Sequence, residues 1–199
     1  MVLNVIAIVI SYLLGSVSFS IVIAKWVKGI DIRQHGSGNA GATNTLRVLG
    51  KGPGIAVFAL DIVKGIAAVG IGHWLGDNSW IPVLCGLAAI TGHNWPIWFG
   101  FKGGKGIATA IGIVVVLCFL PALYAGIVAI ASIVLTRYVS LGSLLFALLT
   151  PLFVLLLGYP MPLFYGTLAF CLFAFFRHRS NIVKLVKGTE NKLGAKKGA

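Results

Sequence analysis

The sequence predicts an all-α polytopic membrane protein with seven transmembrane helices, an N-terminus outside and a C-terminus in the cytoplasm. Of its 199 residues, 58% are hydrophobic and only 10% are charged, and the mean hydropathy is +0.99. An ordinary soluble domain carries about 25% charged residues. The composition therefore excludes that class, and the length leaves room for about six to eight spans.

Three apolar segments occupy the first half of the chain, at about residues 2–24, 53–75 and 81–99. The first has no basic region before it, so it is expected to be a retained span rather than a cleaved signal. The second contains Asp61 and Lys64, three residues apart. Such a pair inside a span is either a mutual ion pair or part of a functional site, and Lys64 suits both roles.

The two remaining apolar stretches, 107–135 and 139–176, are each too long for one typical span. Proline interrupts both stretches, at Pro121 in the first and within "GYPMP", residues 158–162, in the second. Short helices paired at Pro121 and at 158–162 complete the predicted seven.

The basic residues support this division. Seven spans place 15 of the 16 Lys and Arg residues on one side, in segments 25–52, 100–106, 136–140 and 177–199, and the last, Lys64, inside a span. By the positive-inside rule that side is cytoplasmic. The formal charge of +12 then needs no nucleic-acid partner. The chain, 1–199, is expected to form one membrane-embedded domain with a basic tail from about Arg177, part of it an amphipathic surface helix.

The segment "HGSGNAGATNTLR", residues 35–47, contains a literal G-x-G-x-x-G at 36–41. A dinucleotide site needs a β-strand before these glycines and a βαβ unit around them. Here a polar stretch precedes the glycines and an apolar span follows, which excludes that site. Glycines still let consecutive backbone N–H groups face one anion. The segment therefore predicts a phosphate site with the candidate residues Gly36, Ser37, Gly38, Asn39, Gly41, Thr43, Asn44 and Arg47.

A second glycine cluster lies in "GHNWPIWFGFKGGKGIAT", residues 92–109. Its spacing is not that of a Walker A motif, but a glycine turn with a lysine before a helix suits a second anionic group. The candidates are His93, Gly103, Gly104, Lys105, Gly106 and Thr109. Two further clusters on the predicted cytoplasmic side contain Arg137 and Ser143, and then Arg177, His178, Asn181 and Glu190.

Carboxylates and thiols are too sparse for metal or thiol chemistry. The four acidic residues are scattered along the chain, and the three cysteines lie in apolar stretches. Phosphate chemistry on metal ions normally uses clustered carboxylates. We therefore expect no metal and no cofactor. A site rich in anion donors and poor in bases suits phosphate-bearing substrates that carry their own activation.

Five blocks in order carry a resemblance that spans almost the whole chain: "GSGNAGATNTLR", "DIVKG", "GHNWPIWFGFKGGKGIATA", "TRYVSLGS" and "RHRSNIVKLVKGTENK". They are similar to the bacterial acyl-phosphate:glycerol-3-phosphate acyltransferase family (PlsY). The resemblance implies transfer of a fatty acyl group from acyl phosphate to the 1-hydroxyl of glycerol 3-phosphate. The products are lysophosphatidic acid and inorganic phosphate, in bacterial phospholipid synthesis at the inner membrane, with the active site facing the cytoplasm.

The resemblance also implies residue roles. Ser37 and Arg47 belong to the family's first essential block, residues 103–106 to a glycerol 3-phosphate block, and His178, Asn181 and Glu190 to the last. We take Ser37, Arg47, Lys105, His178 and Asn181 as catalytic, and the other candidates, Lys64 and His93 included, as substrate-binding. The general base is left open among His178, His93 and a substrate phosphate. The expected partners are acyl phosphate, glycerol 3-phosphate and membrane lipid, with no nucleic acid and no obligatory protein partner.

The alternative function is a membrane transporter of phosphate or of a phosphorylated solute. A transporter would share the anion site, but it needs polar residues along a path through the membrane. The predicted outer half of the bundle has almost no charged residues, which favours an acyltransferase over a transporter. We expect direct acyl transfer, with neither a metal nor an acyl-enzyme.

Overall fold

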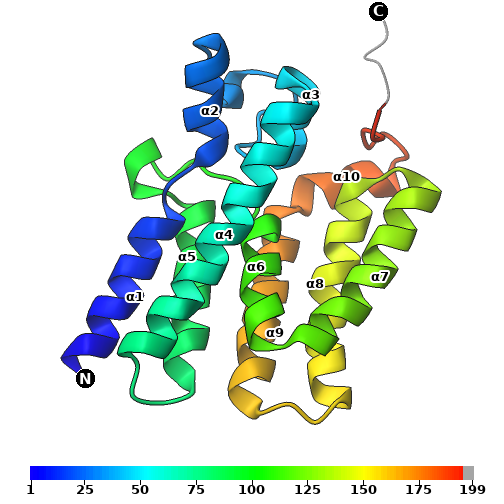
Figure 1. Cartoon of the computed structure of the whole chain (residues 1–199). Coiled ribbons are helices and arrows are strands. Elements are labelled where there is room, and N and C mark those ends of the chain that lie inside the picture. The colour runs from blue at the N-terminus through cyan, green and yellow to red at the C-terminus, as the bar shows by residue number, and fades with distance from the viewer. Residues whose placement is uncertain (195–199) are drawn as a thin grey trace, which may run out of the picture. The chain divides into compact units, whose positions relative to one another are not determined.

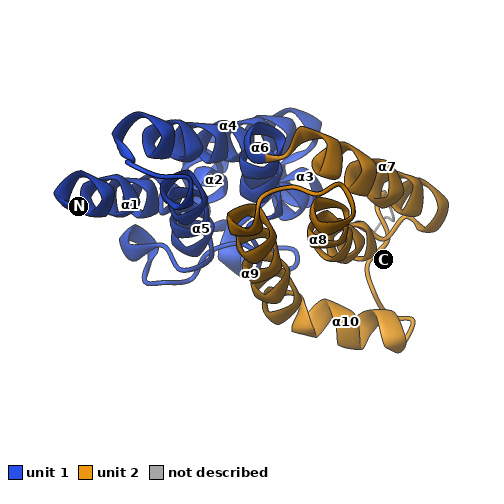
Figure 2. Cartoon of the chain, turned by 90° about the horizontal axis from the view of Figure 1, so that it is seen from below, with its two compact units in different colours: residues 1–117 blue, residues 118–199 orange. Residues whose placement is uncertain are grey.

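The computed structural model describes residues 1–194 and is helical throughout, with no strand in that range (Figure 1). This confirms the all-α prediction. The chain separates into two compact units, 1–117 and 118–199, which Figure 2 colours separately. Residues 195–199, the end of the predicted basic tail, lie outside the described range.

The first unit contains six α-helices and two short 3-10 helices. In chain order they are α1 Val2–Gly15, α2 Phe19–Lys28, η1 Ile32–Gln34, α3 Ala42–Leu49, α4 Lys51–Leu75, α5 Trp80–Asn94, η2 Ile97–Phe99 and α6 Ile107–Leu117. The second unit contains α7 Phe119–Thr136, α8 Val139–Leu156, α9 Met161–Arg177 and α10 Arg179–Val186.

Glycine lets the helices of the first unit approach closely. A Cβ on Gly65 of α4 would overlap the carbonyl oxygen of Thr109, and one on Gly112 of α6 would overlap the carbonyl oxygen of Ile62. Small residues at helix contacts are typical of membrane proteins, where close packing rather than burial from water drives association. These two contacts bring the start of α6 against the middle of α4.

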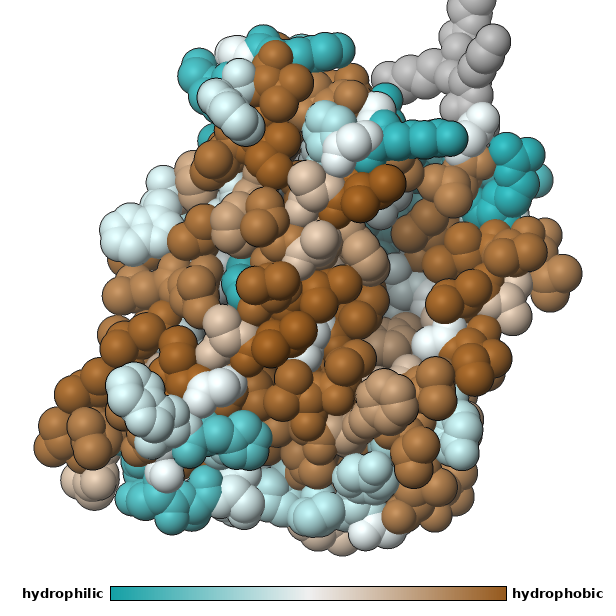
Figure 3. Space-filling model, viewed as in Figure 1, coloured by the Kyte–Doolittle hydropathy of each residue, from teal (hydrophilic) through white to brown (hydrophobic). Residues whose placement is uncertain are grey.

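Charged groups lie toward opposite ends of the first unit. The N-terminal amine lies 3.8 Å from the Asp77 carboxylate, and Asn4 donates to that carboxylate at 2.8 Å, so the chain start and the α4–α5 loop share one end. The helices α2, with Lys25 and Lys28, and α3, with Arg47, lie at the other end (Figure 1). In the view of Figure 3 the surface between the ends of the helices is mainly hydrophobic.

Four helical segments among the described residues are long and apolar enough to cross a membrane. They are Val2–Lys28, Lys51–Leu75, Phe119–Thr136 and Val139–Leu156, and α9 with α10, bent by 63°, gives a fifth if counted as one span. At 15 and 11 residues, α5 and α6 are shorter. The protein is therefore a membrane protein with fewer full-length spans than the seven predicted segments.

Three predicted segments differ from the structure in where their helices break or end. Segment 2–24 is interrupted between Gly15 and Phe19, and segment 81–99 ends as a helix at Asn94, before Pro96. The predicted split of 107–135 into two helices is present, but the break lies at Cys118, with φ of −153°, rather than at Pro121. Proline is tolerated in the first turn of a helix because its missing N–H would have no partner there, so α7 begins before Pro121.

Other predicted features are confirmed. The chain turns between α8 and α9 at residues 157–160, with Gly158 at φ 67°, as "GYPMP" predicts. The basic segment after Arg177 forms the helix α10. The helix α3, which follows the first glycine cluster, lies in a segment that was predicted to be a loop. All three cysteines, Cys85, Cys118 and Cys171, are buried.

The close approach of α4 and α6 predicts a difference between two glycines of the same helix. Gly65→Ala places a methyl group on the Thr109 carbonyl, and overpacking of this kind costs about 1–3 kcal/mol of stability. Gly70→Ala adds the same methyl group where nothing lies within 4 Å. We expect thermal unfolding in detergent to show a lower midpoint for Gly65→Ala only. Equal midpoints would contradict the close packing.

Candidate functional site

The first glycine cluster forms a loop that is held by one buried amide. Gly36 and Gly38 have φ of 65° and 74°, a region that side chains other than glycine rarely adopt. The Asn44 side chain accepts a hydrogen bond from the Ser37 backbone at 2.8 Å. It donates to the carbonyls of Ile32 and His35 at 3.2 and 2.9 Å. Asn44 is 1% exposed, so it shapes the loop rather than facing a ligand.

The helix α3 begins where this loop ends. Gly41 precedes its first turn, and the Thr45 hydroxyl donates to the Gly41 carbonyl at 3.1 Å. Ser37 and Arg47 are exposed, and Thr43 is half-buried in the first turn. The short helix η1, not a strand, precedes the loop, and residues 1–194 contain no strand, which confirms that the glycines are not a dinucleotide motif.

The second glycine cluster folds back onto the end of α5. The backbone N–H groups of Gly103 and Gly104 donate to the carbonyls of Asn94 and His93, at 3.3 and 3.1 Å. Gly106, at φ 80°, then leads into α6. A Cβ on Gly104 would overlap both the Nε2 atom of His93 and the Ala40 carbonyl oxygen. The two glycine clusters, separate in sequence, therefore meet at Gly104.

A buried group of three side chains lies beneath this contact. The Lys64 ammonium lies 2.7 Å from the Asp61 carboxylate, 3.0 Å from Nδ1 of His93 and 2.8 Å from the Val17 carbonyl oxygen. Asp61, Lys64 and His93 are 1%, 2% and 6% exposed. The predicted ion pair of α4 is present, and His93 joins it, which sequence spacing does not indicate.

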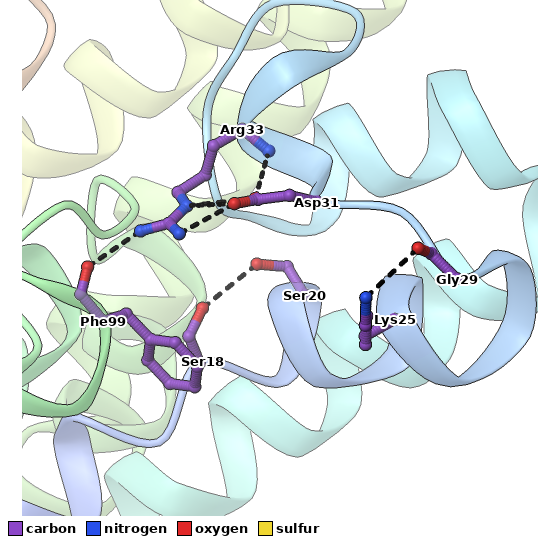
Figure 4. A network of polar contacts seen from close by, with 7 residues as sticks. All are labelled: Ser18, Ser20, Lys25, Gly29, Asp31, Arg33 and Phe99. Atoms are coloured by element: carbon purple, nitrogen blue, oxygen red, sulfur yellow. Dashed lines mark hydrogen bonds and ion pairs between the residues drawn. The ribbon is translucent and has the colours of Figure 1, made fainter.

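A salt bridge ties the two loop regions together (Figure 4). Arg33 contacts both oxygens of the Asp31 carboxylate, at 2.7–3.1 Å, and also donates to the Phe99 carbonyl at 2.8 Å. The hydrogen bonds from Arg33 hold the pKa of Asp31 below its ordinary value. Because the carboxylate form is the one stabilised, this tie is present at neutral pH and is lost as the pH falls through the lowered pKa.

In the second unit, Arg137 holds the C-terminal segment. Its guanidinium donates twice to the Leu193 carbonyl, at 3.1 and 2.8 Å, and the Leu193 N–H donates to the Arg137 carbonyl at 2.7 Å. Ser143 donates to the Val139 carbonyl of its own helix at 2.8 Å. The contacts described for Arg137 and Ser143 are therefore with the backbone of the second unit.

The last cluster lies where α9 meets α10. His178 is 3% exposed, and its Nδ1 lies 2.8 Å from the Ala174 carbonyl oxygen. A carbonyl only accepts hydrogen bonds, so Nδ1 carries the proton and a neutral His178 has its lone pair on Nε2. Asn181 donates to Glu190 at 2.9 Å, and Arg177 is half-buried at the end of α9.

Two buried polar side chains near the second glycine cluster have no hydrogen-bond partner within residues 1–194. They are Asn94, whose carbonyl oxygen lies beside Gly106, and Thr109 in the first turn of α6. Asn94 was not a sequence candidate. In the same range no group of three His, Cys, Asp or Glu side chains is arranged to hold a metal ion.

The chain is similar to glycerol-3-phosphate acyltransferases throughout. Residues 5–188 match the family model described as glycerol-3-phosphate acyltransferase. The glycerol-3-phosphate acyltransferase of Shouchella clausii is 59% identical, with 98% of this chain and 99% of that protein covered. The enzyme of the same name from Halalkalibacterium halodurans is also 59% identical, over 94% of each chain.

Two solved structures share the fold. One is PlsY, an integral membrane glycerol 3-phosphate acyltransferase, in its glycerol 3-phosphate form, with a TM-score of 0.91 and 41% identity over 96% of each chain. The other is the lysophosphatidic acid form of PlsY, with a TM-score of 0.88, 41% identity, and 96% of this chain and 95% of that chain covered.

The contacts of Asn44 predict how the first loop responds to its loss. Asn44→Ala removes one acceptor and two donors from a buried position, at a cost of about 1–3 kcal/mol. We expect faster amide hydrogen exchange at Ser37 and its neighbours in the loop. Gln34→Ala, at an exposed position nearby, is the control and should leave exchange unchanged. Unaltered exchange in Asn44→Ala would show that the amide does not hold the loop.

Proposed function

The chain belongs to the glycerol-3-phosphate acyltransferase family, and on that premise we propose that its two glycine-rich loops hold the two phosphate-bearing substrates of a direct acyl transfer. The activity itself is glycerol-3-phosphate acyltransferase. The observation that carries the proposal is the contact at Gly104, where the second loop lies against the backbone of the first.

The proposed donor is acyl phosphate. The 1-hydroxyl oxygen of glycerol 3-phosphate attacks the acyl carbonyl carbon, the bond from that carbon to the phosphate oxygen breaks, and inorganic phosphate leaves. The hydroxyl proton passes to a base. Phosphate is a good leaving group, so little acid catalysis is needed. Holding both substrates in attack geometry supplies much of the rate, and no acyl-enzyme is formed.

In the first unit the loop 36–43 would hold the acyl phosphate through backbone N–H groups and through Ser37, Asn39 and Thr43. Lys105 and Arg47 would bind the phosphate of glycerol 3-phosphate. Cations and backbone donors stabilise the negative charge that develops on the carbonyl oxygen and the departing phosphate. The geometry supports this assignment because Gly36 and Gly38 are exposed and have positive φ, which exposes the backbone of the first loop.

In the second unit we assign Ser143, His178 and Asn181 to glycerol 3-phosphate. Arg137, Arg177 and Glu190 would support these residues within the second unit, where Glu190 accepts a hydrogen bond from Asn181 and Arg137 donates to the Leu193 carbonyl. Besides His93, two groups are candidate acceptors of the hydroxyl proton. One is Nε2 of His178, which its bond to Ala174 leaves as the lone-pair nitrogen. The other is a phosphate oxygen of the substrate.

We further propose the orientation in the membrane. Seven helical crossings, with α5 and α6 as short ones, would place the N-terminus outside and the C-terminus in the cytoplasm of a bacterial inner membrane. This orientation is supported by the charges of the first unit, which has Asp77 at one end and Lys25 and Lys28 at the other. The acyl chain would lie in the bilayer and glycerol 3-phosphate would arrive from the cytoplasm, with the whole chain acting as one acyltransferase domain.

A reconstitution assay tests the proposed function. Purified protein is incubated with acyl phosphate and labelled glycerol 3-phosphate, and lysophosphatidic acid and released phosphate are measured. We expect equal amounts of the two products, none with acyl-CoA as the donor, and no loss on adding a chelator. Solute flux in liposomes without product would instead indicate a transporter, and product from acyl-CoA alone would contradict the donor.

The His178→Gln substitution separates the two proton acceptors. Gln retains hydrogen bonding but is no base, and a general base contributes about 10²–10⁴-fold to the rate. If His178 takes the proton, kcat falls by that factor. If a substrate phosphate takes it, kcat stays near normal and only KM for glycerol 3-phosphate rises. His73→Gln, at an exposed position at the end of α4, is the control and should behave as the unaltered enzyme.

A further inference from the structure

The helix α10, which follows α9 in the second unit, exposes an apolar side next to a basic side. We propose that α10 docks on the surface of an anionic lipid bilayer. Val183 and Val186 enter the boundary between headgroups and acyl chains, and Lys184 and Lys187 bind lipid phosphates. The docking depends on neither the donor nor the acceptor of the proposed reaction.

Helical spacing gives α10 two exposed sides. Residues separated by four and then three positions lie on the same side of a helix. One exposed side with this spacing consists of Arg179, Val183 and Val186. The neighbouring exposed side, with the same spacing, consists of Ser180, Lys184 and Lys187. The apolar and the basic exposed residues of α10 are therefore separated into adjacent rows.

The third side of α10 belongs to the protein. The helix contacts α8 and α9, and Ile182 and Leu185 are half-buried. Asn181 on the same side donates to Glu190 at 2.9 Å. Val183 and Val186, by contrast, are 52% and 84% exposed. Two apolar side chains of a short helix are thus left uncovered by the part of the unit that the structure describes.

The direction of α10 suits a helix on a membrane surface. It is bent by 63° from α9, and in Figure 1 it runs across the page whereas α8 and α9 run along it. A spanning helix is tilted from the membrane normal by about 20° on average, so α10 runs obliquely toward the membrane plane. An amphipathic helix in that position buries its apolar side in the headgroup boundary and keeps its basic side among the headgroups.

The two lysines of α10 have no carboxylate partner within residues 1–194. Glu190 is the one acidic residue between positions 118 and 194, and it is buried and already bonded to the inner side of α10. Arg179 lies over the ring of Phe176, 4.8 Å from its centroid. Lipid phosphates supply the missing countercharge, because an anionic membrane surface attracts nearby lysines and arginines.

Docking also fixes one part of the candidate site. His178 directly precedes α10, and Asn181 lies in its first turn. A helix held on the bilayer keeps both residues at the depth of the headgroups, where the phosphates of acyl phosphate and lysophosphatidic acid lie. This consequence rests on the proposed function, whereas the docking itself does not.

Photo-crosslinking identifies what covers the apolar side. A benzophenone amino acid replaces Val186 in one variant and Ser180, on the basic side, in another. Each protein is held in nanodiscs of equimolar phosphatidylcholine and phosphatidylglycerol, irradiated, and analysed by mass spectrometry. We expect lipid adducts at position 186 and few at position 180. Equal yields, or adducts at 186 in native membranes that contain protein and no lipid, would overturn the proposal.

The ratio of the two lipids in the adducts tests the role of charge. At position 186 we expect phosphatidylglycerol to exceed phosphatidylcholine by about fivefold or more, the ratio that one lysine near the surface gives. High salt should bring the ratio toward one, and so should Lys184→Gln with Lys187→Gln. The matched control is Lys25→Gln with Lys28→Gln, at exposed positions of α2, which should keep the ratio. A ratio near one in the unaltered chain would overturn the anionic surface.

Amide hydrogen exchange gives a readout without substitution. We expect residues 179–186 to exchange more slowly in nanodiscs that contain phosphatidylglycerol than in nanodiscs of phosphatidylcholine alone, because docking protects the helix. Exchange in α8 is the internal control and should be the same in both. Equal exchange of α10 in the two lipids would contradict docking on an anionic surface. None of these readouts uses a substrate, so failure of the proposed reaction would leave them unaffected.

Discussion

One buried ammonium joins the parts of the first unit. Lys64 on α4 binds the carbonyl of Val17 where α1 gives way to α2, and it binds His93 near the end of α5. An interrupted helix leaves carbonyls without their usual partners, and inside a membrane such groups need replacement partners. Lys64 supplies one, 47 residues away in sequence. The interruption, the position of α5 and the ring of His93 thus depend on the same charge.

Most of the helices and the donor-rich loops are predictable because they follow from local composition. Apolar length gives α4, α7, α8 and α9, and glycines among small donors indicate the loop 36–41. The interruption between Gly15 and Phe19 could not be predicted, and neither could the contact between Lys64 and His93. Both depend on contacts between residues distant in sequence. Asn44 was predicted to contact a ligand because its amide can donate hydrogen bonds. The sequence does not show that this amide is directed to Ile32, His35 and Ser37 of its own loop.

Much of the candidate anion site consists of backbone. Gly36, Gly38 and Gly104 contribute no side chain, and the residues that hold them, Asn44 and His93, are buried beneath. A backbone donor needs no rotamer to be ordered when ligand binds, which lowers the entropy cost of recognition. Substitution removes such a donor only when proline replaces the residue, or disturbs it when a side chain is added at one of these glycines. Variation in such a site must act through the supporting residues and through the charged side chains around it.

The burial of all three thiols has a practical consequence for chemical labelling. Cys85, Cys118 and Cys171 are 0%, 1% and 7% exposed. A maleimide that cannot cross the membrane should react slowly with the native chain, so a single cysteine introduced in an exposed loop would be the main reactive position. Probes attached there could report on sidedness and loop motion without first replacing the three native cysteines.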